Sequence, residues 1–195
     1  MKRIAFIFAL MLLCMAATSR TIEHNLYFGM GVAKSVDRFD SPCALHVGYG
    51  ANIYLSNNWS VMPGIAFRTK FDTGNDAVAK GASDCSFIDV PIVAQYHFSG
   101  ADRNGFVAEL GPVFSFITSN QTVAIMDENY KEGTADMFKH FDLGLQPGIY
   151  YQLGRHWRLG VQAHLGLLNI SKQIQDIKQD SYHFNDVVAT INFHF

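Results

Sequence analysis

Charged residues are scarce in this sequence. They make up 16% of the 195 residues, and the chain carries a net charge of −2. Ordinary soluble domains have about 25% charged residues, so the shortage itself needs an explanation. A near-neutral balance without a basic cluster also excludes nucleic acid as a partner.

Long apolar runs are missing as well, once the first residues are passed. No later stretch approaches the ~18 consecutive apolar residues of a transmembrane helix. At the start, Lys2 and Arg3 precede an apolar core at residues 4–15, which is too short to span a membrane and is followed by small residues. This pattern predicts a secretory signal peptide over residues 1–19, cleaved after Ser19 or alternatively after Ala16.

Cysteine is rare, with three residues in the whole chain. Cys14 lies inside the predicted signal peptide, which leaves Cys43 and Cys85 in the exported protein. Exported proteins form disulfides, and two cysteines allow one pairing. Because both residues fall at the outer ends of predicted strands, we expect a disulfide between them; two separate thiols are the alternative.

Alternation of apolar and other residues runs through almost all of the remaining chain. Apolar side chains recur at every second position, and a period of two predicts β-strands. In the last stretch, for example, Val187, Ile191 and Phe195 share one face. Eight stretches follow this pattern: residues 25–33, 44–55, 59–68, 87–98, 105–116, 140–151, 157–168 and 187–195.

The two faces of these strands differ in chemistry. The apolar face carries no charged residue, whereas the opposite face is made of glycine, glutamine, histidine and a few ions. Strands of about ten residues with one apolar face suit a tilted wall in a bilayer, with the polar face inside a narrow barrel. The fold predicted for residues 20–195 is therefore all-β, an eight-stranded antiparallel up-and-down transmembrane β-barrel.

The connections between the predicted strands alternate in length. Three are short, at residues 56–58, 99–104 and 154–156, and four are longer, at 34–42, 69–85, 118–139 and 169–182. In outer-membrane barrels, short turns face the periplasm and long loops face outward. Aromatic residues at the predicted periplasmic strand ends form an expected interfacial girdle: Phe28, Trp59, Tyr96, Phe98, Phe106, Tyr151, Trp157 and Phe195.

The sequence stops within its last predicted strand. A closed barrel pairs its last strand with its first, because an unpaired backbone edge is unfavourable in hydrocarbon. We therefore expect residues 187–195 to pair with residues 25–33 and to place Phe195 at the membrane interface.

Three stretches carry a resemblance to a known family. FIDVPIVAQYHF, GFVAELGPVFSF and FDLGLQPGIYYQL occur in this order before an aromatic final strand. They resemble the small outer-membrane barrels of Bacteroidota, called PorT-like or outer membrane protein beta-barrel domain proteins, with an eight-stranded OmpA/OmpX-like barrel. The resemblance covers nearly all of the exported chain. It implies outer-membrane location and recognition of Phe195 by the barrel-assembly machinery, and it implies no common catalytic residues.

Several charged residues fall on the polar face and are expected inside the barrel. Arg68 and Asp89 lie near the outer ends of neighbouring strands, while Glu109 and Arg158 lie nearer the periplasmic ends. A buried charge needs a partner, so we expect these four residues to neutralise one another. The inward histidines, at positions 46, 97, 140, 164 and 194, do not converge as metal ligands would, so we expect no metal and no cofactor.

Four prolines fall inside predicted strands: Pro63, Pro91, Pro112 and Pro147. Proline cannot donate a backbone hydrogen bond to a neighbouring strand, so it is usually confined to edge strands and bulges. A closed barrel has no edge strand. We expect bulges or local mispairing at these positions.

The sequence thus favours an integral outer-membrane protein of a Gram-negative bacterium, with a structural or surface-interaction role and no catalysis. Its expected partners are membrane lipids, the barrel-assembly machinery and an unknown surface partner of the outer loops, and we expect a monomer. One alternative is a narrow channel, and another is a lipid A-modifying enzyme that uses Ser115 or Ser181 with His183 and Asp186. A third is a soluble lipocalin-like carrier with the apolar face inward, although the glycine-rich polar face would make a poor solvated surface.

Overall fold

The computed structural model describes residues 22–33, 43–71, 85–101, 104–119, 122–126, 132–136, 138–172 and 181–195. The predicted signal peptide lies outside these residues. No helix in the described part of the chain is long and apolar enough to cross a membrane.

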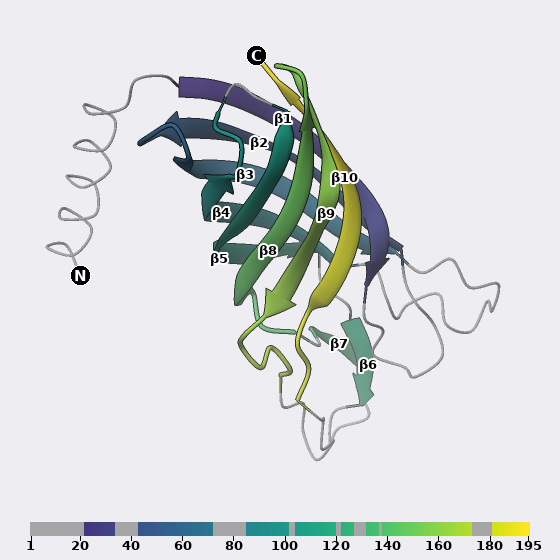
Figure 1. The fold of residues 1–195 in the computed structure, drawn as a ribbon. Helices are drawn as coiled ribbons and strands as arrows, with labels where there is room; N and C mark the ends of the chain where they lie inside the picture. Colours follow the sequence, from purple (N-terminus) through teal and green to yellow (C-terminus); the bar gives the residue numbers. More distant parts are fainter. Residues whose placement is uncertain are drawn as a thin grey trace, which may run out of the picture.

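Eight antiparallel strands close into one barrel (Figure 1). Each strand pairs with its neighbours along the chain, and the order is β1-β2-β3-β4-β5-β8-β9-β10 before the return to β1. The all-β, eight-stranded up-and-down architecture predicted from the alternation is therefore confirmed. The strands are β1 (Ile22–Ala33), β2 (Cys43–Tyr54), β3 (Trp59–Phe71), β4 (Cys85–His97), β5 (Gly105–Ser119), β8 (Phe141–Leu153), β9 (Trp157–Gly166) and β10 (Asn185–His194).

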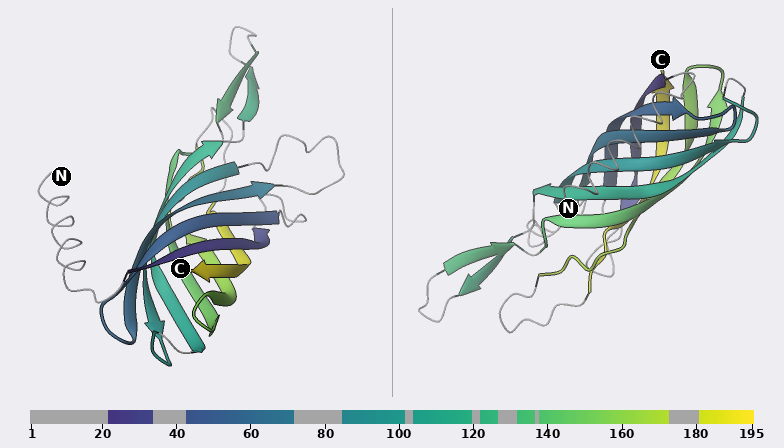
Figure 2. Two further views of the ribbon diagram at one scale, coloured as in Figure 1. Left: turned by 90° about the horizontal axis from the view of Figure 1, so that it is seen from above. Right: turned by 90° about the vertical axis from the view of Figure 1, so that its left-hand side faces the viewer.

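A second, two-stranded sheet lies in the longest predicted loop. β6 (Thr122–Met126) pairs with β7 (Glu132–Asp136) as an antiparallel hairpin that shares no ladder with the barrel. Figure 2 shows the hairpin projecting beyond one end of the barrel. The sequence did not predict it, because strands of five residues are too short for a clear period-two signal.

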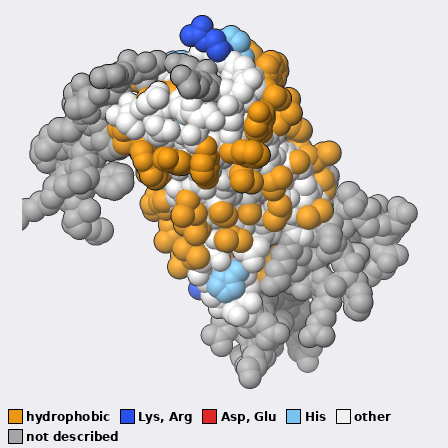
Figure 3. Space-filling model, in the orientation of Figure 1, with side chains coloured by type: hydrophobic (Ala, Val, Ile, Leu, Met, Phe, Trp, Pro, Cys, Tyr) orange, Lys and Arg blue, Asp and Glu red, His pale blue; other side chains and the backbone are white. Residues whose placement is uncertain are grey.

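The period of two separates a lipid-facing wall from a polar interior. Outward side chains such as Leu26, Ile65, Leu110 and Ile149 are about half exposed, and Figure 3 shows hydrophobic side chains spread over the wall. Inward positions are buried and mostly polar. The soluble carrier required the apolar face to point inward, so that alternative is wrong.

The seam between the first and last strands is paired to its end. β1 and β10 are in register from Asn25 opposite His194 to Ala33 opposite Asp186. Beyond this ladder, His24 and Phe195 exchange two backbone hydrogen bonds of 3.0 Å. The pairing expected of the final strand is thus present, and in hydrocarbon it leaves no edge at this seam.

The prolines interrupt pairing without shifting it. Between β3 and β4, the pair Pro63–Ile92 is followed by Ala66–Asp89, so two positions on each strand, Pro91 among them, are unpaired while the register is kept. The same happens around Pro112 in β4–β5 and Pro147 in β8–β9. The one register shift in the β4–β5 ladder lies at Ser86/Phe87. Of the two effects expected at the prolines, bulges do not occur there, whereas pairing is lost locally.

Aromatic side chains gather at the end of the barrel that carries the short turns, which we call the short-turn end (residues 55–58, 98–104 and 154–156). Their ring centroids lie 4.9 to 6.0 Å apart in three groups: Trp59–Tyr96–Phe98, Phe106–Tyr151 and Trp157–Phe193–Phe195. Phe28 is elsewhere, opposite Val47 and Ile191 in the middle of β1. It falls there because β1 begins at Ile22, before the Asn25 start that the sequence indicated.

The two cysteines lie at the opposite, long-loop end. Cys43 begins β2 on the outward side and is half-buried, whereas Cys85 begins β4 on the inward side and is buried. β3 runs between them, and no disulfide joins them in the structure. A disulfide needs the two Cβ atoms to approach within about 4.5 Å on converging vectors. The pairing therefore stays a prediction of the sequence.

Gel mobility tests the closed barrel and the cysteine geometry together. We expect unboiled protein from the membrane fraction to migrate faster than boiled protein, because a closed barrel resists unfolding by detergent. The disulfide predicted from the sequence would make the mobility of the boiled protein depend on reductant, whereas two thiols separated by β3 would give equal mobility. A reductant-sensitive shift would establish the Cys43–Cys85 pairing, and equal mobility before and after boiling would contradict closure.

Candidate functional site

The barrel interior holds a charge cluster near the long-loop end, centred on Arg68. Its Nε donates to Asp89 over 2.7 Å, and its two Nη atoms donate to Asp186 and Ser115 over 3.1 and 3.2 Å. Nε2 of His46 lies 3.1 Å from the other oxygen of Asp186. The Arg68 side chain is fully buried, so these contacts replace its hydration.

Arg68 joins strands on several sides of the lumen. Asp89 and Ser115 come from β4 and β5, whereas Asp186 comes from β10, on the other side of the seam. The sequence paired Arg68 with Asp89, and the structure brings these two together. The sequence did not predict Asp186 as a second partner of Arg68. Asp186 lies 118 positions further along the chain and becomes a neighbour of Arg68 only when the barrel closes.

A second polar cluster lies deeper, toward the short-turn end. The Glu109 carboxylate accepts hydrogen bonds from Gln95, Gln146 and Tyr150 over 2.9, 2.8 and 2.6 Å. Arg158 does not reach Glu109. Its Nη1 donates to the Gln95 side-chain oxygen over 3.1 Å, so the Gln95 amide stands between the two charges.

The Glu109–Arg158 pair expected from the sequence is therefore a bridged arrangement rather than an ion pair. Inward polar residues on β4, β8 and β9 were visible in the alternation, but which of them would lie between the charges depends on the register.

Inward glycines make room for neighbouring rings inside the barrel. A Cβ added at Gly48 would overlap the ring of Tyr27, and one added at Gly144 would overlap the ring of His164. Both rings are buried. The glycine-rich polar face seen in the sequence thus reflects the small diameter of the barrel.

An aromatic cap closes the lumen at the long-loop end; it consists of Phe87, Phe138, Ile170, Tyr182 and Phe184 with neighbouring apolar groups. The Phe184 ring lies 4.7 Å from that of Phe87 and 5.0 Å from that of Phe138. The segments before β8 and after β9 are hydrogen-bonded over the mouth, with Ile170 accepting from Lys139 and donating to Tyr182.

Two cations beneath the cap contact its aromatic rings. The Arg68 guanidinium lies 4.2 Å from the Phe87 ring centroid, and Nζ of Lys70 lies 4.5 Å from that of Phe184. Such cation–π contacts favour a desolvated cation under an aromatic face. Sequence reasoning missed the cap, because Phe138 and Ile170 lie outside the barrel strands.

The structure places the candidate catalytic residues in different surroundings. Ser181 is exposed at the rim, while Asp186 is buried in the lumen and engaged by Arg68 and His46. Ser115 accepts from Arg68. Of the inward-predicted histidines, His140 is exposed and pairs with Asp136 over 3.4 Å. No group of three or more metal-ligating side chains converges within the described residues.

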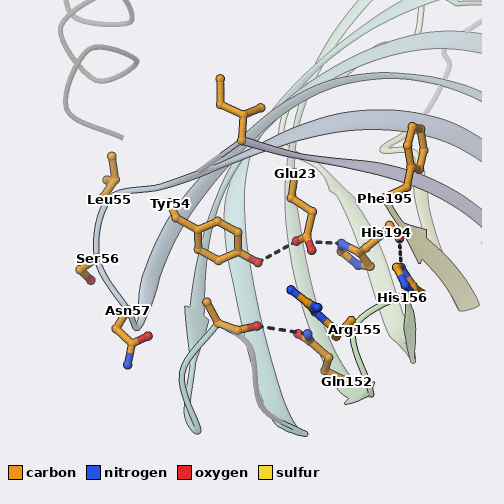
Figure 4. Close-up of a pocket in the computed structure, with 12 residues that line it drawn as sticks. Glu23, Tyr54, Leu55, Ser56, Asn57, Gln152, Arg155, His156, His194 and Phe195 are labelled. Carbon is orange, nitrogen blue, oxygen red and sulfur yellow. Dashed lines mark hydrogen bonds and ion pairs between the residues drawn. The ribbon is translucent and has the colours of Figure 1, made fainter. Parts of the chain in front are cut away.

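A cavity of about 610 Å³ opens at the short-turn end (Figure 4). Glu23 stands at its centre, where its Oε2 accepts from the Tyr54 hydroxyl over 2.8 Å and lies 3.2 Å from Nδ1 of His194. Gln152 lies below, and Arg155 points into the space between them.

Comparisons with known proteins agree with this architecture. The family described as "Outer membrane protein beta-barrel domain" matches residues 17–172. No curated protein sequence matches the chain.

Solved structures share the fold at low identity. The outer membrane enzyme PagL has a TM-score of 0.54 and 10% identity, over 86% of this chain and 97% of that one. Neisserial surface protein A has a TM-score of 0.51 and 11% identity, over 89% and 97%. Ail, the attachment invasion locus protein of Yersinia pestis, has a TM-score of 0.49 and 11% identity, over 89% and 98%. The first two are an enzyme and a surface protein, so the likeness shows the fold alone.

Substitution of Arg68 tests the charge cluster. In Arg68→Met, two carboxylates, Asp89 and Asp186, stay buried without the guanidinium, so we expect the free energy of unfolding to fall by about 3–5 kcal/mol. Urea titration in lipid vesicles, followed by tryptophan fluorescence, measures it. Adding Asp89→Asn and Asp186→Asn should recover much of the loss.

The exposed Lys139→Gln is the control and should stay within about 0.5 kcal/mol of the wild type. Equal stability of Arg68→Met and the wild type would contradict the cluster's role.

Proposed function

The chain belongs to the outer membrane protein beta-barrel domain family, and on that premise we propose that it is a rigid membrane scaffold that presents its long-loop end for surface contacts. In this proposal it is neither a channel nor an enzyme, it binds no cofactor, and it acts as a monomer. It is exported through a signal peptide cleaved near residue 19 and is inserted by the barrel-assembly machinery. We also propose membership of the PorT-like barrels of Bacteroidota, on the strength of the quoted motifs alone.

The filled lumen is the observation that carries this proposal. A barrel of eight strands is just wide enough for side chains to fill it. Here Arg68 with its carboxylates crosses the lumen at one depth, and the bonds from Glu109 to Gln95 and Gln146 cross it at another. The aromatic cap lies above both clusters. A continuous water path would have to break all three.

Two further observations favour a surface role over catalysis. Asp186, the acid of the candidate triad, is buried and held by Arg68 and His46 inside the lumen, whereas Ser181 is exposed. The connections at the long-loop end are longer than the short turns, and one of them extends into the β6–β7 hairpin (Figure 2). Long external loops on a rigid scaffold are where binding residues concentrate.

Conductance of reconstituted protein tests the scaffold against the channel. We expect planar bilayers containing the heat-modifiable protein to show no stepwise conductance, because the side chains bonded to Arg68 and Glu109 cross the lumen. A general porin in the same bilayers serves as the positive control. Reproducible unitary steps that scale with the amount of folded protein would contradict the filled lumen.

Removal of the hairpin tests the surface role. Replacing residues 120–135 by a short Gly-Ser turn should leave the heat-modifiable band unchanged, because β6 and β7 share no ladder with the barrel. In a strain that lacks the protein, the full chain should restore cell–cell and cell–surface adhesion at least several-fold better than this variant, at equal amounts in the outer membrane. Full restoration by the variant would contradict a contact role for the hairpin and would favour a purely structural barrel.

A further inference from the structure

We propose that the cavity at the short-turn end binds a small oxyanion, the carboxylate or phosphate group of a periplasmic solute. This goes beyond the scaffold role, because it assigns a ligand site to the end of the barrel that faces away from the surface. The cavity volume of about 610 Å³ lies within the usual range of small-molecule sites.

The two arginines at this end lack a carboxylate partner. Neither Arg155 nor Arg158 forms an ion pair with a carboxylate in the part of the chain that the structure describes. Arg155 points into the cavity below Glu23 in Figure 4. Arg158 lies behind the cavity floor, where its Nη2 donates to the Gln152 side-chain oxygen over 3.2 Å, and Gln152 itself lines the cavity.

Comparison of the two buried arginines shows what is unusual about Arg158. Arg68 and Arg158 are both fully buried. Arg68 is neutralised by two carboxylates, whereas Arg158 has the neutral side-chain oxygens of Gln95 and Gln152 as acceptors, and its Nε has none among the described residues. A buried cation whose direct hydrogen-bond acceptors are neutral gains from a nearby anion, and the Glu23 carboxylate on the cavity lining already interacts with Arg158 electrostatically.

The remaining lining suits an anion better than a cation. Glu23 is the one carboxylate among the lining residues, and its Oε2 is already engaged by Tyr54 and His194. Arg155 in the cavity and Arg158 behind its floor therefore outnumber the single carboxylate by one positive charge. His194 is buried, and its Nε2 has no partner in the described chain, so it offers a further polar contact beside the cavity. Guanidinium groups bind carboxylate and phosphate through paired, charge-assisted hydrogen bonds.

The position of the cavity favours a soluble anion over a lipid headgroup. The lining comes from the ends of β1, β2, β8 and β10 and from all three short turns, which surround the barrel axis, so the strand wall separates the cavity from the lipid. A headgroup would reach it only over the rim, beside Ile22 and Phe195.

Side-chain resonances of arginine test the site directly. ¹⁵N-labelled mature protein in dodecyl maltoside micelles is titrated with inorganic phosphate at constant ionic strength. We expect the Nε–H signals of Arg155 and Arg158 to shift with one saturable curve. The Nε–H signal of Arg68 is the internal control and should not move, because its Nε already donates to Asp89 over 2.7 Å.

Two single substitutions sharpen the result. Arg155→Gln should weaken phosphate binding at least about tenfold, as expected for the loss of a charge-assisted contact. Lys139→Gln removes an exposed cation at the opposite end and should bind as the wild type does. The heat-modifiable band establishes that each variant is folded, so weaker binding by Arg155→Gln is not a folding defect.

A second arm separates the two sources of the anion. Nanodiscs of phosphatidylglycerol and of phosphatidylcholine replace the micelles. A saturable phosphate shift in both kinds of disc supports the site with a soluble ligand. A shift of Arg155 in phosphatidylglycerol discs before phosphate is added, with no further shift on addition, supports the same site filled by a headgroup. Linear shifts, equal shifts at Arg68, or an unchanged affinity in Arg155→Gln would overturn the proposal.

Discussion

Backbone hydrogen bonding in hydrocarbon is the constraint on which this structure depends. A strand edge in the bilayer would leave a row of N–H and C=O groups without partners, so the sheet has to close on itself. Closure is completed by the β1–β10 ladder and by the two bonds between His24 and Phe195. It also fixes the lumen at a diameter that side chains fill. The inward glycines beneath Tyr27 and His164 follow from that diameter.

Closure also brings together charges that are distant in sequence. Arg68 on β3 meets Asp186 on β10, and a cation buried in a narrow lumen is tolerated because two carboxylates and a hydroxyl surround it. Arg158 is equally buried but has only amide partners. The interior is therefore electrostatically uneven, with the paired arginine below the aromatic cap and the unpaired one near the cavity.

The two ends of the barrel also differ in how far the lumen is covered. At the long-loop end, segments outside the strands fold back and bury Phe138, Ile170 and Phe184 over the mouth. At the short-turn end, the turns are too short to cover the lumen, and a cavity remains between Glu23, Gln152 and Arg155. An aromatic cluster thus lies over the lumen at the long-loop end, whereas a cavity opens at the short-turn end.

The sequence by itself determined the number of barrel strands, their faces and the closure of the barrel. These follow from local rules: a period of two assigns each side chain to a face, and an apolar face without charges belongs in lipid. The pairing of Arg68 with Asp89 was predictable too, because the two residues lie on adjacent strands.

Only the tertiary structure decided the register across the prolines, the second partner of Arg68, the Gln95 bridge, the aromatic cap and the β6–β7 hairpin. Each of these depends on which residues face one another across the lumen or over its mouth. Alternation gives the face of a residue but not its depth or its partner across the barrel, and those are set by register and closure.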